Sequence, residues 1–118
     1  MTIQYHGQSP RLSEATVANG FIFLAGMVPE NTDVDVTKQT QDVLAQIDKW
    51  LAECGSDKNH ILEATIFLPN LADYDAMNIA WDAWVNPQHS PARACIEAKS
   101  AKPEWKVEIK VSAVQIQK

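Results

Sequence analysis

The sequence predicts an α+β domain in which two helices cover one face of a mixed β-sheet. Two segments carry apolar residues at helical spacing, and several short segments have the pattern of strands, with glycine, proline and asparagine residues between them. The expected order is β-β-β-α-β-α-β-β within a single domain over residues 1–118. Because both helices cover the same face, the other face lacks a partner within the chain, which favours an oligomer.

The amino-terminal part is expected to form three short strands. Ile3 to His6 forms the first, and "TVANGFIFLAG" contains two more, joined at Asn19-Gly20. This dipeptide suits a tight hairpin turn. Phe21 to Leu24 is apolar throughout, which predicts burial on both faces, and the strand ends at Gly26 and Pro29.

Two amphipathic helices follow, with the strand "HILEATIFLPN" between them. The first ends at Gly55, and its apolar stripe comprises Val36, Val43, Leu44, Ile47, Trp50, Leu51 and Cys54. The second is expected from about Asp73 to Val85 and ends at "NPQHSP". Its apolar stripe comprises Tyr74, Met77, Trp81 and Trp84. We interpret the tryptophans on the two stripes, Trp50, Trp81 and Trp84, as core residues.

The last two strands are expected at Ala92 to Ala98 and at Trp105 to about Gln115. Successive strand side chains point to opposite faces, so Arg93, Cys95 and Glu97 share one face and small apolar residues share the other. Cysteine is usually buried. This polar face is therefore expected to be covered, by a ligand or by a partner subunit.

Composition and charge limit the classes of protein to which this chain can belong. The chain has 118 residues, 46% of them hydrophobic, and its longest apolar runs are far shorter than a membrane span. The start "MTIQYHGQ" lacks the features of a signal peptide, so we expect a cytoplasmic protein without a membrane partner and with reduced cysteines. The net charge of −5 weighs against nucleic acid, and no Cys/His cluster predicts a metal.

Arg93 and Glu108 are the most informative polar pair. Both are expected on polar-bearing faces of neighbouring strands, and a guanidinium matches a carboxylate in two parallel hydrogen bonds. Arg93 can therefore bind a carboxylate ligand. It can equally form an ion pair within the chain, with Glu97 or Glu108, and the residues alone leave both interpretations open.

Other polar residues give weaker signals. Cys95 has no obvious histidine partner for nucleophilic catalysis and is better interpreted as a small buried side chain. Asn78 is a poor residue for the middle of a helix, so it either faces solvent or makes a specific hydrogen bond. The histidines are expected in or near loops, and their spacing does not bring them to one site; they are His6, His60 and His89.

Three segments resemble the RidA/YjgF-like family, once described as translation-inhibitor endoribonucleases. They are "NIAWDAWV", "SPARACIEAK" and "KVEIKVSAV", and the upstream segment "NGFIFLAGMVPEN" fits the same pattern. The most specific feature is a Pro-Ala-Arg tripeptide followed 15 positions later by the glutamate of "VEI" (108 − 93 = 15). The resemblance implies a chorismate-mutase-like fold and a homotrimer whose sheets form a central barrel, with ligand clefts between subunits.

The resemblance also implies a site and an activity. Arg93 would bind the carboxylate of a 2-imino or 2-keto acid, Glu108 would be the catalytic residue beside the reactive atom, and Cys95 and Asn78 would line the cleft. The best-known activity of the family is the cofactor-free hydrolysis of enamine/imine intermediates to 2-keto acids and ammonia. Glu108 would then orient or deprotonate a water molecule.

This sequence departs from the deaminating members at two places. Those members carry Gly-Pro-Tyr upstream of the second strand, whereas the segment from Ser9 to Ala15 contains no tyrosine, and Ala25 replaces their serine. The sequence therefore leaves turnover open. The alternatives are a non-catalytic metabolite-binding or regulatory module and, with less support, a ribonuclease or translation inhibitor.

Overall fold

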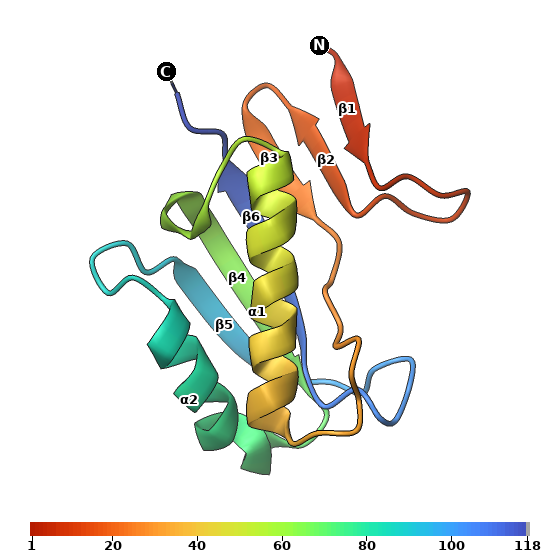
Figure 1. The fold of residues 1–118 in the computed structure, drawn as a ribbon, viewed down its shortest axis with the longest axis vertical. Helices are drawn as coiled ribbons and strands as arrows, with labels where there is room; N and C mark the ends of the chain where they lie inside the picture. Colours follow the sequence, from red (N-terminus) through yellow and green to blue (C-terminus); the bar gives the residue numbers. More distant parts are fainter. Residues whose placement is uncertain (118) are drawn as a thin grey trace.

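The structure, a computed structural model, describes residues 1–117 and contains a six-stranded sheet with two α-helices on one face (Figure 1). The strands lie in the order β1-β2-β3-β6-β4-β5. Only the β4–β5 pair is parallel, so the sheet is mixed. The predicted order of strands and helices is confirmed. Lys118, which the predicted domain includes, lies outside the described residues.

The bounds of the elements follow the sequence pattern closely. The strands are β1 (Ile3–His6), β2 (Ala15–Ala18), β3 (Phe21–Leu24), β4 (Ile61–Leu68), β5 (Ala92–Glu97) and β6 (Glu108–Val114). The α-helices are α1 (Val36–Glu53) and α2 (Tyr74–Trp84), and the short 3₁₀ helices η1 (Lys58–His60) and η2 (Leu71–Asp73) precede β4 and α2.

The last strand begins later than the expected Trp105. The backbone N–H of Trp105 donates to the carbonyl of Lys102 within a turn and is therefore not available to a neighbouring strand. Regular pairing starts at Glu108, opposite Phe67 of β4. The turn thus places Trp105 just ahead of the strand, beside the first residue of β6.

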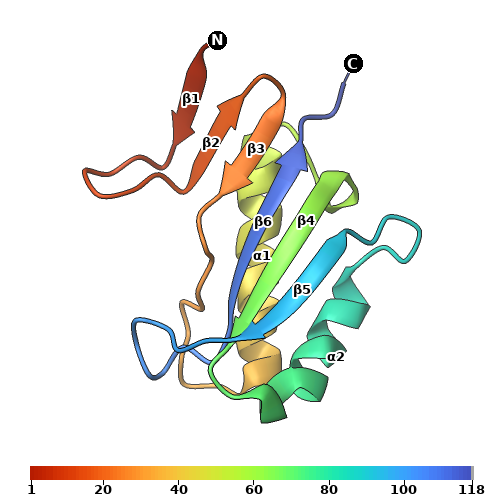
Figure 2. The same ribbon diagram turned by 180° about the vertical axis from the view of Figure 1, so that it is seen from behind.

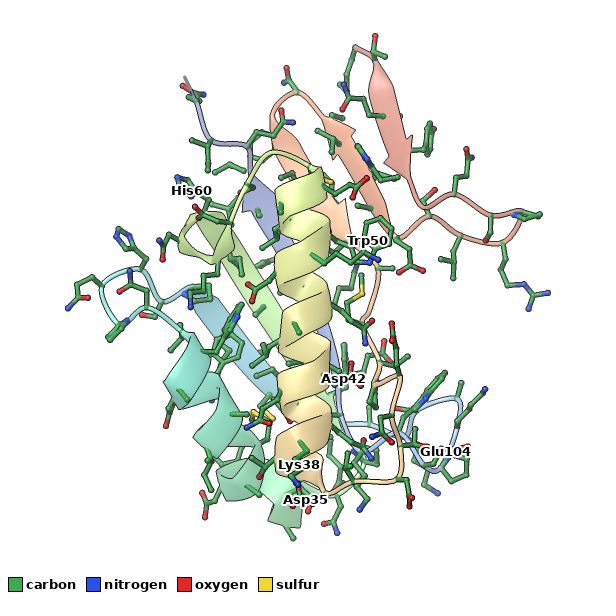
Figure 3. The ribbon with its side chains drawn as sticks, viewed as in Figure 1. Asp35, Lys38, Asp42, Trp50, His60 and Glu104 are labelled. Carbon is green, nitrogen blue, oxygen red and sulfur yellow. The ribbon has the colours of Figure 1, made fainter. Side chains whose placement is uncertain are left out.

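Local chemistry explains the hairpin and the first helix. Asn19 and Gly20 have φ angles of 57° and 83°, which a tight β2–β3 turn requires at both central positions. The side chain of Asp35 accepts from the backbone N–H of Lys38 at the start of α1, where both residues are seen (Figure 3). At the other end, Gly55 has a φ of 79° and completes the predicted helix stop.

The hydrophobic core lies between the sheet and the two helices, and the opposite sheet face is open (Figure 2). On β3, Ile22 and Leu24 are buried against the helices, whereas Phe21 and Phe23 are 46% and 50% exposed on the open face. The expectation that β3 is buried on both faces is therefore wrong for a single chain, because no element within residues 1–117 covers that side. Within residues 1–117, no helix combines the length and hydrophobicity needed to cross a membrane.

A fully buried glutamine connects α1 to two loops. The Gln39 carboxamide donates to the carbonyls of Thr32, Val34 and Glu104, and its oxygen accepts from the backbone N–H of Lys106 at 2.9 Å. The loop that leads into β6 is thereby fixed to the helix layer. Gln39 supports the position at which Glu108 enters the sheet.

Replacing Gln39 by leucine should destabilise the fold by about 1–3 kcal/mol, because the Lys106 N–H loses its acceptor in a buried place. Urea denaturation at one protein concentration measures the change. The matched control is Gln41→Leu on the exposed side of α1, which should shift stability by roughly 0.5 kcal/mol or less. Equal stability of the two variants would contradict a structural role for Gln39.

Candidate functional site

Arg93 projects from β5 toward the helix layer. It pairs with Ala64 of β4, which in turn pairs with Val111 of β6, and both of these neighbours are buried under the helices. Residues paired in this way share one face of the sheet. The alternation predicted for Arg93, Cys95 and Glu97 is confirmed by this register. The element that covers Arg93 is α2 of the same chain, whereas a ligand or a partner subunit was the expected cover.

Three residues of α2 contact the guanidinium of Arg93. Its Nη1 donates to Oδ1 of Asn78 at 2.8 Å, and its Nη2 donates to the hydroxyl of Tyr74 at 3.1 Å. Its central carbon lies 5.2 Å from the centre of the Trp81 ring and 5.8 Å from that of the Tyr74 ring. Asn78 therefore makes a specific hydrogen bond, which was one of its two expected roles.

The partners of Arg93 are neutral. Among residues 1–117, Arg93 forms no salt bridge with Glu97, Glu108 or any other carboxylate. The alternative of an ion pair within the chain is therefore wrong. The guanidinium has five N–H groups and uses two of them in these contacts, so donors remain for a ligand. A separate depression of about 190 Å³ over β4 and β5 lies on the open face, since Glu63, Thr65, Ala92 and Ala94 point there.

Cys95 lies on the same face of β5 as Arg93 and is partly buried against the hydrophobic core. Burial raises the pKa of the Cys95 thiol, and the nearby positive charge of Arg93 opposes this shift only in part. The group therefore stays a thiol at neutral pH, which agrees with its interpretation as a small buried side chain. Cys54, at the end of α1, is also a free thiol, and burial raises its pKa as well.

We expect Cys95 to react more slowly with iodoacetamide than free glutathione does at pH 7.5, because its raised pKa leaves little reactive thiolate. The rate should increase as the pH rises above the ordinary thiol range. Mass spectrometry of the peptide containing Cys95 follows the reaction, and the urea-unfolded chain serves as control. A faster reaction than glutathione at pH 7.5 would show that the thiol is activated.

Glu108 lies on the opposite face of the sheet from Arg93. The next residue, Ile109, is fully buried under the helices, so Glu108 points to the open face. Its carboxylate lies against the backbone of Gly26, where a Cβ atom would overlap Oε2. A side chain at position 26 would displace the flexible end of Glu108, so glycine lets the carboxylate keep this position.

Glu108 lines a cleft of about 390 Å³ at the edge of β3 and β6. The walls include three carboxylates and several apolar side chains, among them Leu12, Glu14, Ala25, Glu30 and Trp105. Both departures from the deaminating pattern therefore lie in this cleft, since Leu12 belongs to the segment without tyrosine. The cleft beside Glu108 is more apolar at these two positions than a tyrosine and a serine would make it.

Arg93 and Glu108 are not on neighbouring strands, contrary to expectation. β4 lies between β5 and β6 because the parallel β4–α2–β5 connection places β5 at the edge of the sheet. The two side chains also point to opposite faces. A single small molecule cannot contact both residues of the same chain.

Two of the three histidines, His60 and His89, lie near Asp57, and His6 lies apart from them on β1. His6 is on β1, His89 lies in the loop after α2, and His60 ends η1, near the start of β4 (Figure 3). Nδ1 of His60 lies 2.7 Å from Asp57, and this contact lowers the pKa of the Asp57 carboxyl. Within residues 1–117, no group of three or more histidine, cysteine, aspartate or glutamate side chains is arranged to bind a metal.

Two partners of Arg93 were missed by the sequence reasoning. The sequence pattern places both residues, Tyr74 and Trp81, on the apolar stripe of α2, and the core position expected for Trp81 is confirmed, since it is 5% exposed; its contact with Arg93, like that of Tyr74, is not contained in the pattern. Their positions four residues before and three residues after Asn78 place all three on adjacent helical turns. That spacing around a polar mid-helix residue was the available signal.

A comparison with known protein families identifies the family to which this chain belongs. Residues 6–115 match the family model described as "Endoribonuclease L-PSP". The chain belongs to the YjgF/RidA family. The predicted relationship is thereby confirmed over nearly the whole length of the sequence.

Relatives and solved structures agree with this assignment. A YjgF-family protein from Neisseria meningitidis has 59% identity and a TM-score of 0.98, with 100% of this chain and 98% of that chain covered. A "RutC family protein" from Haemophilus ducreyi is 52% identical, covering 87% and 88% of the two chains. A protein from Acinetobacter baylyi named "3-aminoacrylate deaminase RutC" is 34% identical, covering 80% and 79%.

Proposed function

We propose that this YjgF-family protein binds a small carboxylate metabolite in a cleft between subunits of a homotrimer and hydrolyses an enamine or imine to a 2-keto acid and ammonia. The observation that carries the proposal is the state of Arg93, which is held in place by neutral partners and pairs with no acid among residues 1–117. The related deaminase from Acinetobacter baylyi supports the same type of reaction.

The need for a second subunit follows from the positions of Arg93 and Glu108. Because they lie on opposite faces of one sheet, the two groups meet at one ligand only when different chains contribute them. The open face offers an apolar surface for such contact, with Phe21, Phe23 and Ile96 each between 46% and 50% exposed. Covering these side chains with another copy removes apolar surface from water.

The chemistry needs few groups. Arg93 binds the ligand carboxylate in the plane of its guanidinium, and Glu108 of a neighbouring subunit lies near the carbon that carries the nitrogen. An enamine first takes up a proton on carbon to become the imine. Glu108 then accepts a proton from water as the water oxygen attacks the imine carbon, and returns this proton to nitrogen to give a carbinolamine. The hydroxyl proton of the carbinolamine next passes through Glu108 to the amine, so the carbonyl forms as the C–N bond breaks and ammonia leaves.

Asn78 and Cys95, the other two residues predicted for the site, lie at the arginine end of the cleft. Asn78 fixes the guanidinium, and Cys95 contributes a neutral, partly buried surface on the same face. The reaction as written requires no cofactor. The three carboxylates of this cleft, Glu14, Glu30 and Glu108, would repel the phosphates of RNA, which weighs against ribonuclease activity.

A non-catalytic metabolite-binding module is the second candidate, and Leu12 and Ala25 are the observation that favours it. These apolar residues line the cleft beside Glu108 and cannot hydrogen-bond a water molecule or an intermediate through their side chains. A binding module would be stabilised by small carboxylates in a thermal-shift assay and would release no ammonia.

The reaction can be tested with freshly generated 2-aminoacrylate and an assay for ammonia and keto acid. Arg93→Ala should lower kcat/KM by at least roughly tenfold, since the carboxylate loses a charged hydrogen-bonding partner. Glu108→Gln should lower kcat with a smaller change in KM.

The control for this assay is Lys38→Ala, which removes a positive charge from the exposed first turn of α1 (Figure 3). It should leave the rate unchanged. Full activity of Arg93→Ala would remove the arginine from the mechanism, and no activity of the wild-type protein combined with carboxylate binding would favour the binding module.

Assembly can be tested by light scattering at micromolar concentration. The wild-type protein should have the mass of a trimer, and Phe23→Glu should dissociate it, because the substitution places a charge within the apolar open face. The matched control is Ile79→Glu on α2, where the side chain is 64% exposed on the helix layer. A wild-type monomer would contradict the proposed inter-subunit cleft.

A further inference from the structure

The Tyr74 hydroxyl holds an unused proton beside the guanidinium. Arginine has only donors, so in the 3.1 Å contact with Nη2 the tyrosine oxygen must be the acceptor. The O–H bond of Tyr74 is therefore free to point elsewhere. Within residues 1–117 this hydroxyl has no other hydrogen-bond partner, and the side chain is partly open to solvent, with the residue 41% exposed.

The position of this proton matters because of its distance from Arg93. A ligand oxygen that accepts from Nη2 lies within reach of the Tyr74 hydroxyl, since the two groups are in contact with each other. A carboxylate has several acceptor positions and can take hydrogen bonds from both. The hydroxyl and the guanidinium thus form adjacent donors for one negatively charged group.

The surroundings of Arg93 strengthen this arrangement. The rings of Tyr74 and Trp81 approach the guanidinium, and Asn78 occupies Nη1, so the arginine has little freedom to move toward a different partner. The α2 residues that touch Arg93 are uncharged, and none contributes a carboxylate that would compete with a ligand. The Tyr74 hydroxyl therefore faces a fixed cation.

We propose that Tyr74 is a further ligand-binding residue, which donates its hydroxyl proton to the carboxylate that Arg93 binds. This inference rests on the proposed function, in which Arg93 is the anchor for a small carboxylate. The Tyr74 hydroxyl of α2 is then a second donor beside the guanidinium of Arg93. The two donors make the arginine end of the cleft selective for an acceptor-rich, negatively charged group. The alternative is that Tyr74 only positions Arg93.

The experiment measures pyruvate binding by isothermal titration calorimetry. Tyr74→Phe keeps the ring beside Arg93 and removes only the hydroxyl, so the dissociation constant should rise by about tenfold. The chain has two tyrosines, and Tyr5→Phe gives the matched control. Tyr5 lies on β1, at the opposite edge of the sheet from β5, and its variant should bind pyruvate as the wild type does.

A second readout separates donation from positioning. The ¹⁵N relaxation of the Arg93 Nε group should be the same in free wild type and free Tyr74→Phe, because Asn78 and Trp81 still hold the guanidinium. Weaker binding with an equally rigid Arg93 supports direct donation. Weaker binding with a mobile Arg93 overturns it and leaves Tyr74 as a positioning residue.

Arg93→Ala distinguishes failure of this inference from failure of the proposed function. Unchanged binding in Tyr74→Phe, together with lost binding in Arg93→Ala, overturns only the role of Tyr74. Wild-type affinity in Arg93→Ala, or no pyruvate binding by the wild-type protein, overturns the arginine anchor and the tyrosine inference with it.

Discussion

The site depends on the way in which a strand arginine is held by uncharged residues of a helix. Arg93 leaves β5 under α2 and receives an amide, a hydroxyl and two aromatic rings instead of a carboxylate. A cation held by an acid would be neutralised within the protein, whereas neutral partners fix its direction and leave its charge for a ligand. The parallel β4–α2–β5 unit sets this geometry, because it places the helix directly over the strand that it precedes.

Much of the fold was predictable because its signals are local. The hairpin at Asn19-Gly20, the stripe of α1 and its end at Gly55 depend on turn chemistry and on residues close in sequence. The alternation of Arg93 with its apolar neighbours is also a property of one strand. The bounds of these elements agree with the prediction to within a few residues. The exception is β6, whose pairing with β4 starts later than expected because a turn precedes Glu108.

The relation between the site residues was not predictable in the same way. Whether Arg93 and Glu108 share a face depends on strand order and on the register across β4, which no local pattern in either strand contains. The contacts of Tyr74 and Trp81 with Arg93 were not predictable, because a helical stripe does not distinguish a ring that packs on leucine from one that packs on a guanidinium. The family resemblance supplied the roles of both charged residues, but the partners of Arg93 came from the structure.

The contact between Gly26 and Glu108 constrains how this cleft can diverge. A carboxylate that rests on a bare α-carbon occupies the space of the missing side chain, so a larger residue at position 26 would move the Glu108 carboxylate, whereas a smaller residue at position 108 would meet no obstacle. Leu12 and Ala25, on the same walls, have no such restriction. The walls of the cleft can therefore change without moving the acid, whereas a change at position 26 also changes where the acid lies.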